Sequence, residues 1–365
     1  MNKNNWTYKK LGEVCVTSSG GTPSKSHKEY YDCGTIPWLR SGEVAQGLIY
    51  DTELCITELG LKKSSAKLFP VDTVVIAMYG ATVGQVGLLK NEMATNQAVC
   101  GIFPNRYFSP LFLLYCLKSK KSIFLKDAVG GAQPNISQNL IKNTIVPIPP
   151  LAEQERIVAE LDLLSSIIEK KKAQLKELDQ LAQSIFYDMF GDPITNEKGW
   201  EVKAFEDTIC NVVYTKKLQR KDYLENGLIP IISQEDEFIS GYWNNVDDAF
   251  KVDSPVVIFG DHTRVIKYID FSFVLGADGV KILKPINDIN TRYFFSFLKN
   301  CNVPSLGYSR HYKLLKELFV PLPPLSLQQE FAKKVEAIEQ QKSLIQQSIV
   351  EVQTMFDYTM DKYFG

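Results

Sequence analysis

Histidine is scarce in this sequence, and cysteine never occurs in a metal-binding spacing. The 365 residues include only three histidines, His27, His262 and His311, and seven cysteines, none of which form a Cys-X-X-Cys pair. Structural zinc sites are usually built from four such ligands at short spacings, so we expect no metal, and nothing points to a cofactor. An odd number of scattered cysteines is typical of reduced, mostly buried thiols in a cytoplasmic protein.

Long hydrophobic runs are also missing. The longest apolar stretch, residues 111–117, is far shorter than the roughly 20 residues that a membrane helix requires. Residues 1–5 are followed by no apolar segment, so we expect no secretory signal peptide. We therefore expect a cytoplasmic protein without membrane contact.

The motifs of enzymes that act on DNA are incomplete or absent. An adenine methyltransferase would need a glycine-rich turn for S-adenosylmethionine and an Asn/Asp-Pro-Pro-aromatic string, and neither occurs. Residues 19–26 resemble a P-loop, but serines stand where its two glycines belong. Nuclease-type carboxylates and lysines occur only as fragments at residues 191–193 and 251–253, and His262 fits a polar loop better than a general base. The sequence therefore predicts binding and assembly without chemistry of its own.

The net charge of −1 hides an uneven distribution along the chain. Residues 1–146 carry 16 Lys and Arg against 10 Asp and Glu, whereas residues 147–190 carry 5 against 8. Residues 191–320 carry 16 against 18, and residues 321–365 carry 4 against 6. A basic first segment is compatible with nucleic-acid binding by part of the chain. The segment 191–320 would need a locally basic face to do the same.

An internal repeat organises the chain. Residues 146–154, Val-Pro-Ile-Pro-Pro-Leu-Ala-Glu-Gln, return as residues 320–328, Val-Pro-Leu-Pro-Pro-Leu-Ser-Leu-Gln, at an offset of 174 residues. At the same offset, Phe190-Gly191 matches Phe364-Gly365. The sequence therefore contains two copies of one unit, each made of a globular domain, a proline-rich joint and a helix.

Each proline-rich joint is followed by a long heptad pattern. Apolar residues alternate at spacings of four and three over residues 157–189 and 331–363, and are interrupted by Lys171 and Lys342. A period of 3.5 residues predicts a coiled coil, and each helix of about 38 residues would span roughly 57 Å. The simplest arrangement is an antiparallel pair about a pseudo-twofold axis. The two lysines either set the register or pack their stems in the seam with their amines in solvent.

Both globular halves show short β-type runs and one predicted helix, which indicates an α+β class with β-rich cores. In the first half the runs are residues 14–16, 74–78, 86–89 and 99–103, with a helix near 109–126. In the second half they are residues 229–232, 256–259, 265–269 and 280–283, with a helix near 290–300.

Four strings in the first half resemble the target-recognition domains of Type I restriction–modification specificity subunits. They are residues 19–24 (Ser-Gly-Gly-Thr-Pro-Ser), 36–43 (Ile-Pro-Trp-Leu-Arg-Ser-Gly-Glu), 94–98 (Ala-Thr-Asn-Gln-Ala) and 131–137 (Gly-Ala-Gln-Pro-Asn-Ile-Ser). Residues 147–158 and 321–331 resemble the joints and helix starts of the same family. The second half lacks the Gly-Thr-Pro and Thr-Asn-Gln strings, so its assignment depends on the repeat.

The resemblance implies two target-recognition domains, an antiparallel helical spacer, and assembly on double-stranded DNA with two methyltransferase subunits, with or without two restriction-translocation subunits. We place the first recognition domain at residues 1–146, its joint and helix at 147–191, the second domain at 192–320, and its joint and helix at 321–365. Because the two domains have diverged, we expect an asymmetric target of two short half-sites separated by bases that are not read.

Polar residues on glycine-rich loops are the candidate DNA contacts, since Arg suits guanine and Asn or Gln suits adenine. In the first domain we predict Arg40, Ser41, Tyr79, Thr82, Gln133, Asn135, Ser137 and Gln138. In the second we predict Lys216, Lys217, Arg220, Lys221, His262, Arg264, Tyr308, Ser309, Arg310 and His311. The cluster 216–221 suits phosphate contacts better than base contacts. The alternatives are solvated loop groups, a partly buried position for both tyrosines, and a role for Asn96 and Gln97 in holding a buried turn.

The helix starts are the predicted partner surface, at Glu153, Gln154, Arg156, Gln328 and Gln329. Two other functions compete with this interpretation. One is a single-chain DNA-modifying enzyme, which a cofactor titration would detect. The other is a coiled-coil interaction protein whose end domains bind proteins, which a gel shift on duplex DNA would separate.

Overall fold

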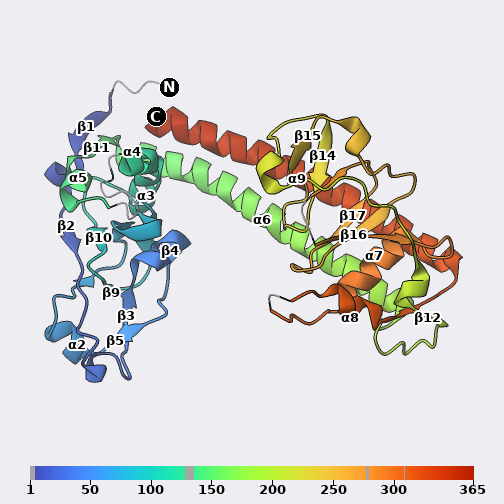
Figure 1. Cartoon of the computed structure of the whole chain (residues 1–365). Helices are drawn as coiled ribbons and strands as arrows, with labels where there is room; N and C mark the ends of the chain where they lie inside the picture. The colour runs from blue at the N-terminus through green and yellow to red at the C-terminus, as the bar shows by residue number, and fades with distance from the viewer. Residues whose placement is uncertain (1–4, 127, 129–134, 277–278, 308) are drawn as a thin grey trace. The chain divides into compact units, whose positions relative to one another are not determined.

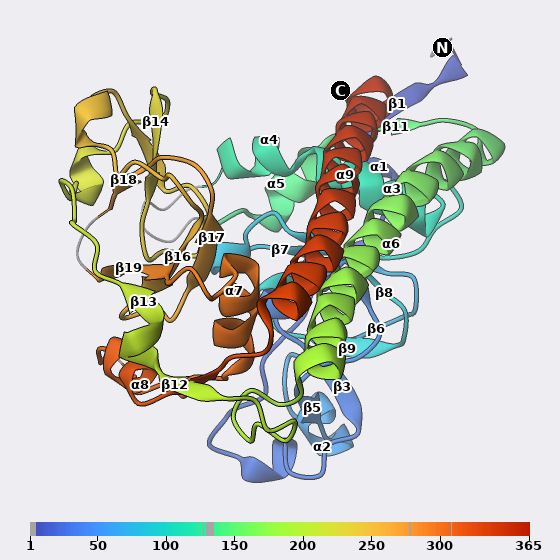
Figure 2. The same ribbon diagram turned by 90° about the vertical axis from the view of Figure 1, so that its right-hand side faces the viewer.

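The chain folds into two compact units, each of which contains part of both long helices. In the computed structural model, residues 5–126, 128, 135–276, 279–307 and 309–365 are described. Unit 1 comprises residues 1–170 and 349–365, and unit 2 comprises residues 171–348. The long helices are α6 (Leu151–Phe190) and α9 (Leu325–Phe364), each of 40 residues (Figures 1 and 2).

Unit 1 is built on two small sheets. The strand order in the first sheet is β2 (Thr17–Ser19), β10 (Val99–Ile102), β7 (Val74–Ala77), β8 (Val86–Leu89) and β4 (Leu48–Ile49). The order in the second is β5 (Cys55–Ile56), β3 (Ile36–Leu39), β9 (Met93–Thr95) and β6 (Leu68–Phe69). The short helices are α1 (Leu11–Val14), α2 (Glu58–Lys62), α3 (Pro110–Ser119), α4 (Lys121–Lys126) and α5 (Gln138–Asn143).

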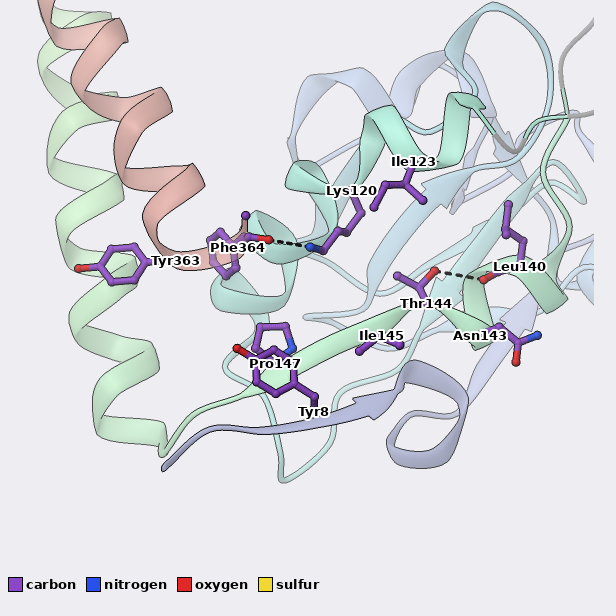
Figure 3. Close-up of a pocket in the computed structure, with 11 residues that line it drawn as sticks. Tyr8, Lys120, Ile123, Leu140, Asn143, Thr144, Ile145, Pro147, Tyr363 and Phe364 are labelled. Atoms are coloured by element: carbon purple, nitrogen blue, oxygen red, sulfur yellow. Dashed lines mark hydrogen bonds between the residues drawn. The ribbon is translucent and has the colours of Figure 1, made fainter. Parts of the chain in front are cut away.

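A separate ribbon pairs β1 (Thr7–Lys10) with β11 (Ile145–Ile148), so the predicted boundary at residue 146 falls inside a strand. The end of α9 is anchored nearby, because the amine of Lys120 donates to the carbonyl oxygen of Phe364 over 2.6 Å (Figure 3). Tyr8, Ile145 and Phe364 line an apolar hollow of about 410 Å³ beside this contact.

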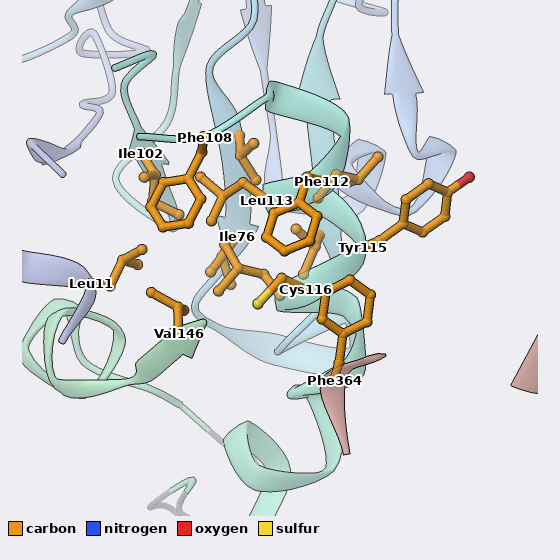
Figure 4. Close-up of a cluster of buried hydrophobic side chains, with 14 of the residues drawn as sticks. Leu11, Ile76, Ile102, Phe108, Phe112, Leu113, Tyr115, Cys116, Val146 and Phe364 are labelled. Carbon is orange, nitrogen blue, oxygen red and sulfur yellow. The ribbon is translucent and has the colours of Figure 1, made fainter. Parts of the chain in front are cut away.

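Strand β7 is buried on both faces, which explains its unbroken apolar sequence. Ile76 belongs to the cluster that contains Phe108 and Phe112, whereas Val75 packs in a second cluster on the opposite face (Figure 4). Phe364 closes the first cluster, with its ring centroid 5.3 Å from that of Phe112. The core of unit 1 therefore includes the last turn of α9.

Two predictions for unit 1 are wrong in detail. The strand expected over residues 14–16 does not form there: Leu11–Val14 make a helical turn that places Leu11 and Val14 together in the core, and β2 begins at Thr17. The helix expected over 109–126 is divided at Lys120 into α3 and α4, which lets Phe124 pack into the same core.

Unit 2 repeats this plan with fewer strands among its described residues. One sheet has the order β13 (Ile209–Cys210), β19 (Val280–Pro285), β16 (Val256–Gly260) and β17 (Ile266–Ile269), and the other has β15 (Gly241–Trp243), β14 (Ile229–Ile232) and β18 (Val274–Leu275). The ribbon is β12 (Val202–Ala204) with β20 (Phe319–Pro321), and the short helices are α7 (Thr291–Asn300) and α8 (Tyr312–Lys316). Helix α7 lies beside β16 and β17, as α3 lies beside β7 and β8 in unit 1 (Figure 2).

The heptad prediction is confirmed by the burial of the seam. Every seam position over residues 157–189 and 331–363 is buried or half-buried, while most positions between them are exposed. In unit 1 the Tyr363 hydroxyl near the end of α9 donates to Glu160 near the start of α6 over 2.5 Å. In unit 2 the ring of Phe331 lies 5.2 Å from that of Phe190 at the end of α6. The helices therefore pair antiparallel, and the predicted α+β fold with an internal repeat is confirmed.

Candidate nucleic-acid interface

Three of the motif strings of the first half meet at one edge of unit 1. A Cβ atom on Gly20 would lie 2.1 Å from the carbonyl oxygen of Thr95, so only glycine allows this approach. The indole of Trp38 donates to the carbonyl of Gly21 over 3.0 Å, and the Asn96 amide donates to the carbonyl of Leu39 over 2.9 Å. The loops after β2, β3 and β9 are thereby held against one another.

These loops surround a cavity of about 550 Å³ that combines cations, amides and aromatic rings. Its wall consists of Thr22, Lys25, Lys28, Tyr31, Asp32, Trp38, Arg40, Leu54, Asn96 and Gln97. Of these residues only Arg40 was among the predicted DNA contacts, and Asn96 and Gln97 were predicted to hold a turn. The motif strings also contain Thr22 and Trp38, whereas the other wall residues lie outside them and no sequence signal marked these: Lys25, Lys28, Tyr31, Asp32 and Leu54.

Arg40 forms ion pairs with two carboxylates. Its Nε donates to the buried Glu43 over 3.3 Å, and one of its terminal nitrogens pairs with Glu53. The side chain remains 40% exposed, so it can still reach a ligand at the edge of the cavity. Ser41 follows in a half-buried 3-10 turn, residues 41–46.

A second group of predicted contacts extends this edge. Tyr79 is 45% exposed and forms an isolated β-bridge with Asn135. In the ladder of β7 and β10, Ala77 pairs with Val99 and the Met78 amide donates to Ala98 over 2.8 Å. Continuing this register places Tyr79 opposite Gln97. The structure thus brings Tyr79, Asn135 and the cavity wall to one side of the sheet.

The remaining predictions in unit 1 have local structural roles. Thr82 is half-buried in a 3-10 turn, and the hydroxyl of Ser137 caps α5 by accepting from the Leu140 amide over 3.1 Å. The side chain of Gln138 donates to Thr17 over 2.8 Å. Gln133 lies outside the described residues.

In unit 2 two of the predicted cations, Lys216 and Arg220, are paired with carboxylates. Lys216 contacts Asp248 at 3.1 Å and lies over the ring of Trp243 at 5.2 Å. The indole hydrogen bond of Trp243, followed by that of Lys216, holds the pKa of Asp248 below its usual range. Arg220 contacts Glu235 at 2.6 Å, while Lys217 lies 5.6 Å from the ring centroid of Tyr214 and Lys221 is exposed.

His311, another predicted DNA contact in unit 2, has a buried side chain in the structure and is not presented to a ligand there. Its Nδ1 faces the carbonyl oxygen of Asp261 at 3.0 Å, and its Nε2 accepts from the Leu306 amide over 2.9 Å. Since an amide can only donate, Nε2 must be the unprotonated nitrogen. His311 thus holds the segment that carries the exposed residues Ser309 and Arg310.

The other predicted contacts in unit 2 lie on two turns. His262 is half-buried, and its backbone amide donates to the side-chain oxygen of Gln234 over 3.1 Å. Arg264 has a positive φ of 64° and donates to the carbonyl of Val303 over 3.0 Å. Tyr308 lies outside the described residues.

Two of the predicted partner contacts, Gln154 and Gln328, are not on the surface. Both are buried, and each ties the start of a long helix to its globular unit. Gln154 accepts from the Ser109 amide over 2.8 Å and donates to the carbonyls of Tyr107 and Pro149. Their side chains point inward because the first helical turn is covered by the loop before α3 or α7.

The other three predicted partner residues have accessible side chains. Glu153 accepts from the indole of Trp6 over 3.1 Å and is 27% exposed. Arg156 is 54% exposed and lies 3.6 Å from Glu160. Gln329 is exposed on the first turns of α9. These residues remain candidates for a protein contact.

The described part of the chain contains neither a metal-binding cluster nor a membrane-spanning helix. No group of three or more His, Cys, Asp and Glu side chains is arranged there to hold a metal ion. None of the helices described is both long and apolar enough to cross a membrane.

Comparison with known proteins gives consistent matches to one family. Residues 3–180 and 197–354 match the model of the Type I restriction modification DNA specificity domain. The Type I restriction enzyme MjaIX specificity subunit of Methanocaldococcus jannaschii is 33% identical over 247 residues, which are 62% of this chain and 57% of that protein. The EcoR124I/EcoR124II specificity subunit of Escherichia coli is 29% identical over 165 residues, 44% of this chain and 41% of that protein.

The fold is also similar to that of a solved structure. The S subunit of a Type I restriction-modification system from M. genitalium has a TM-score of 0.60 at 18% identity, with 100% of this chain and 98% of that one covered. The family match covers both halves of the repeat, including the second half, which lacks two of the motif strings. The chain belongs to the family of Type I restriction modification DNA specificity domains.

Proposed function

We propose that this chain is a non-catalytic specificity subunit that binds one split site in double-stranded DNA. Each unit contacts one half-site through the loops at the edge of its sheets. In complex with two methyltransferase subunits, with or without two restriction-translocation subunits, it directs their activity to that site. The proposal rests on the family match, and on the relatives that are named specificity subunits.

The observation that carries a split, asymmetric site is a duplicated fold with different edges. In unit 1 the edge presents Arg40, Asn96 and Gln97 around a cavity. In unit 2 the loop that follows β16 carries His262 and Arg264, and Gln234 after β14 accepts from the His262 amide. Because unlike side chains match unlike base edges, the two half-sites should differ in sequence.

The two units should also differ in how they bind the phosphate backbone. Lys216 and Arg220 of unit 2 are paired with Asp248 and Glu235, so a phosphate must compete with these carboxylates. Lys25 and Lys28 of unit 1 are exposed. We therefore assign unit 1 the larger share of the salt-dependent affinity.

The test is the pattern of adenine methylation in cells that express the chain with its methyltransferase subunit. We expect one asymmetric motif of two short half-sites with unread bases between them. Methylation that follows no motif, or a palindromic motif, would contradict the proposal. A gel shift with the purified complex and a matching duplex, with the scrambled duplex as control, checks binding directly.

A further inference from the structure

The amide groups in the wall of the unit 1 cavity are fixed by the protein itself. The backbone amide of Ala98 donates to the side-chain oxygen of Asn96 over 3.1 Å. The hydroxyl of Thr22 donates to the side-chain oxygen of Gln97. In both side chains the oxygen is therefore engaged, and the NH₂ group is the one left to meet a ligand.

This orientation bears on which base the cavity can accept. Bidentate recognition of adenine by Asn or Gln needs both amide atoms, the oxygen for N6 and the nitrogen for N7. The protein already uses one of the two lone pairs of each oxygen, so these amides are less suited to that contact than amides whose oxygens are unpaired. The two NH₂ groups are instead suited to hydrogen-bond acceptors.

Arg40 adds a third donor at the same wall. Its Nε and one terminal nitrogen are held by Glu43 and Glu53, and in the described part of the chain no contact involves the other terminal nitrogen, Nη1. Two adjacent acceptors in the major groove, O6 and N7, occur only on guanine. The donors of this wall match that edge.

Asp32 gives a base pair a contact that a phosphate cannot use. Lys25 and Lys28 in the same wall attract phosphate, whereas the exposed carboxylate of Asp32 repels it. A carboxylate is, however, the usual acceptor for the N4 amine of cytosine. One carboxylate beside several donors is thus complementary to guanine paired with cytosine.

We propose that the unit 1 cavity reads a G·C base pair, with Asn96, Gln97 and Arg40 directed to guanine and Asp32 to cytosine. Lys25 and Lys28 contact the adjoining phosphates. This inference rests on the proposed function, and it assigns one base pair of the half-site that unit 1 binds. Thr22 acts as a positioning residue, because it touches Gln97 rather than the base.

The first experiment measures discrimination with the assembled complex of this chain and its methyltransferase subunit. Duplexes carry the methylated motif of the wild-type complex, or that motif with one G·C pair of the unit 1 half-site changed to A·T. We expect the change to weaken wild-type binding about 10- to 100-fold at one such position. Thr22→Val, which frees the oxygen of Gln97, should reduce that ratio at least severalfold by admitting adenine. Thr22→Ser, which keeps the hydroxyl, should retain the wild-type ratio of affinities for the two duplexes.

Variants of the lysines distinguish base contacts from backbone contacts. Lys25→Ala and Lys28→Ala should weaken binding to all duplexes alike and lower the salt dependence by about one counterion each. Asn96→Ala and Gln97→Ala should abolish the preference for G·C and leave the salt dependence unchanged. Circular dichroism of each variant confirms that it is folded.

The results separate the two proposals. Wild-type complex that methylates no defined motif overturns the proposed function. A defined motif in which no G·C position responds to Thr22→Val, Asn96→Ala or Gln97→Ala overturns only the inference. Loss of affinity that is equal for all duplexes in Asn96→Ala and Gln97→Ala would show a backbone contact and also overturn it.

Discussion

Gln154 and Gln328 occupy equivalent places in the two copies of the repeat and make equivalent hydrogen bonds. Each accepts from a backbone amide in the loop before α3 or α7 and donates to the second-last proline of its own joint, over 2.8–2.9 Å. A buried amide side chain that satisfies three backbone groups fixes where a helix leaves its unit. The glutamine at this place is therefore structural in both copies.

Replacing this glutamine should cost much more stability than replacing its neighbour. Gln328→Ala leaves the Asn290 amide and the Pro323 carbonyl without their partner, and we expect a loss of about 2–3 kcal/mol in the free energy of unfolding. Gln329→Ala, at an exposed position of the same turn, should change it by less than about 0.5 kcal/mol. Urea denaturation measures both, and equal effects would contradict the structural role.

Cysteine reactivity should report the same division between buried and exposed positions. Burial raises the pKa of Cys15 to about 11, and that of Cys100 and of Cys116 to about 12. Cys33 and Cys210 are exposed. Because the thiolate is the reactive form, iodoacetamide at pH 8 should label Cys33 and Cys210 in the folded protein and the buried thiols only after denaturation. Peptide mass spectrometry would show early labelling of Cys100 if the core of unit 1 were open.

At the scale of the element, the long helices were predictable and the cavity was not. The seams follow from a spacing that is local in sequence, and residues 157–189 and 331–363 are buried as that spacing requires. The strand predicted over residues 14–16 was wrong, because Leu11 and Val14 lie three apart and this spacing also fits the helical turn that the structure shows. The cavity depends on the approach of Gly20 to Thr95, a tertiary contact that no local pattern encodes.

The predictions for Gln154, Gln328 and His311 assumed that polar side chains lie on the surface. Gln154 and Gln328 were expected on the outer face, because polar helix positions usually meet water. Both are buried, since the loop before the next short helix covers the first turn of each long helix. His311 is a similar case. Its ring is buried and holds its loop together through hydrogen bonds to backbone groups.

Lys342 interrupts the seam of α9 and should lower the stability of the helix pair. Its side chain is 17% exposed, and its amine contacts Asp179 at 2.8 Å and Glu339 at 3.0 Å. Partial burial tends to lower the pKa of this amine, and the two carboxylates outweigh that effect and raise it. The lysine is therefore charged at neutral pH and does not reach freely into solvent.

Lys342→Leu should stabilise the protein by about 1 kcal/mol, because a seam leucine buries apolar surface and leaves only exposed carboxylates behind. Lys333→Leu, at an exposed position of α9, is the matched control and should give no gain. Thermal denaturation at pH 7 measures both. A destabilised Lys342→Leu would mean that the ion pairs contribute more than the apolar contact that replaces them.

At the scale of the whole molecule, both copies of the repeat share one pair of long helices, and each unit has its own set of loops. Each long helix is 40 residues, or about 60 Å at 1.5 Å per residue, and each contributes to the core of both units. In the proposed function the loops contact the bases that each unit recognises. In that proposal the length of the helices sets the number of unread base pairs between the two half-sites.

That idea predicts how the unread gap should respond to longer helices. Inserting three heptads, roughly 21 residues or about 32 Å, after Ile168 in α6 and before Val352 in α9 keeps the seam in register. One turn of B-DNA is about 34–36 Å and 10–10.5 base pairs. The variant should therefore methylate the same two half-sites with a gap about 10 base pairs longer, as adenine methylation mapping would show.

Two control variants test this prediction. One extends α6 alone, and the other inserts a single heptad into both helices. Extending α6 alone mismatches the two seams, so we expect loss of stability and of methylation. One heptad in both helices adds about 11 Å, or about three base pairs, which turns the second half-site by about 100° around the DNA axis. A stiff helix pair cannot follow that rotation, so this variant should fold but methylate poorly at any gap. If the three-heptad variant instead kept the original gap, the helices would not set the spacing.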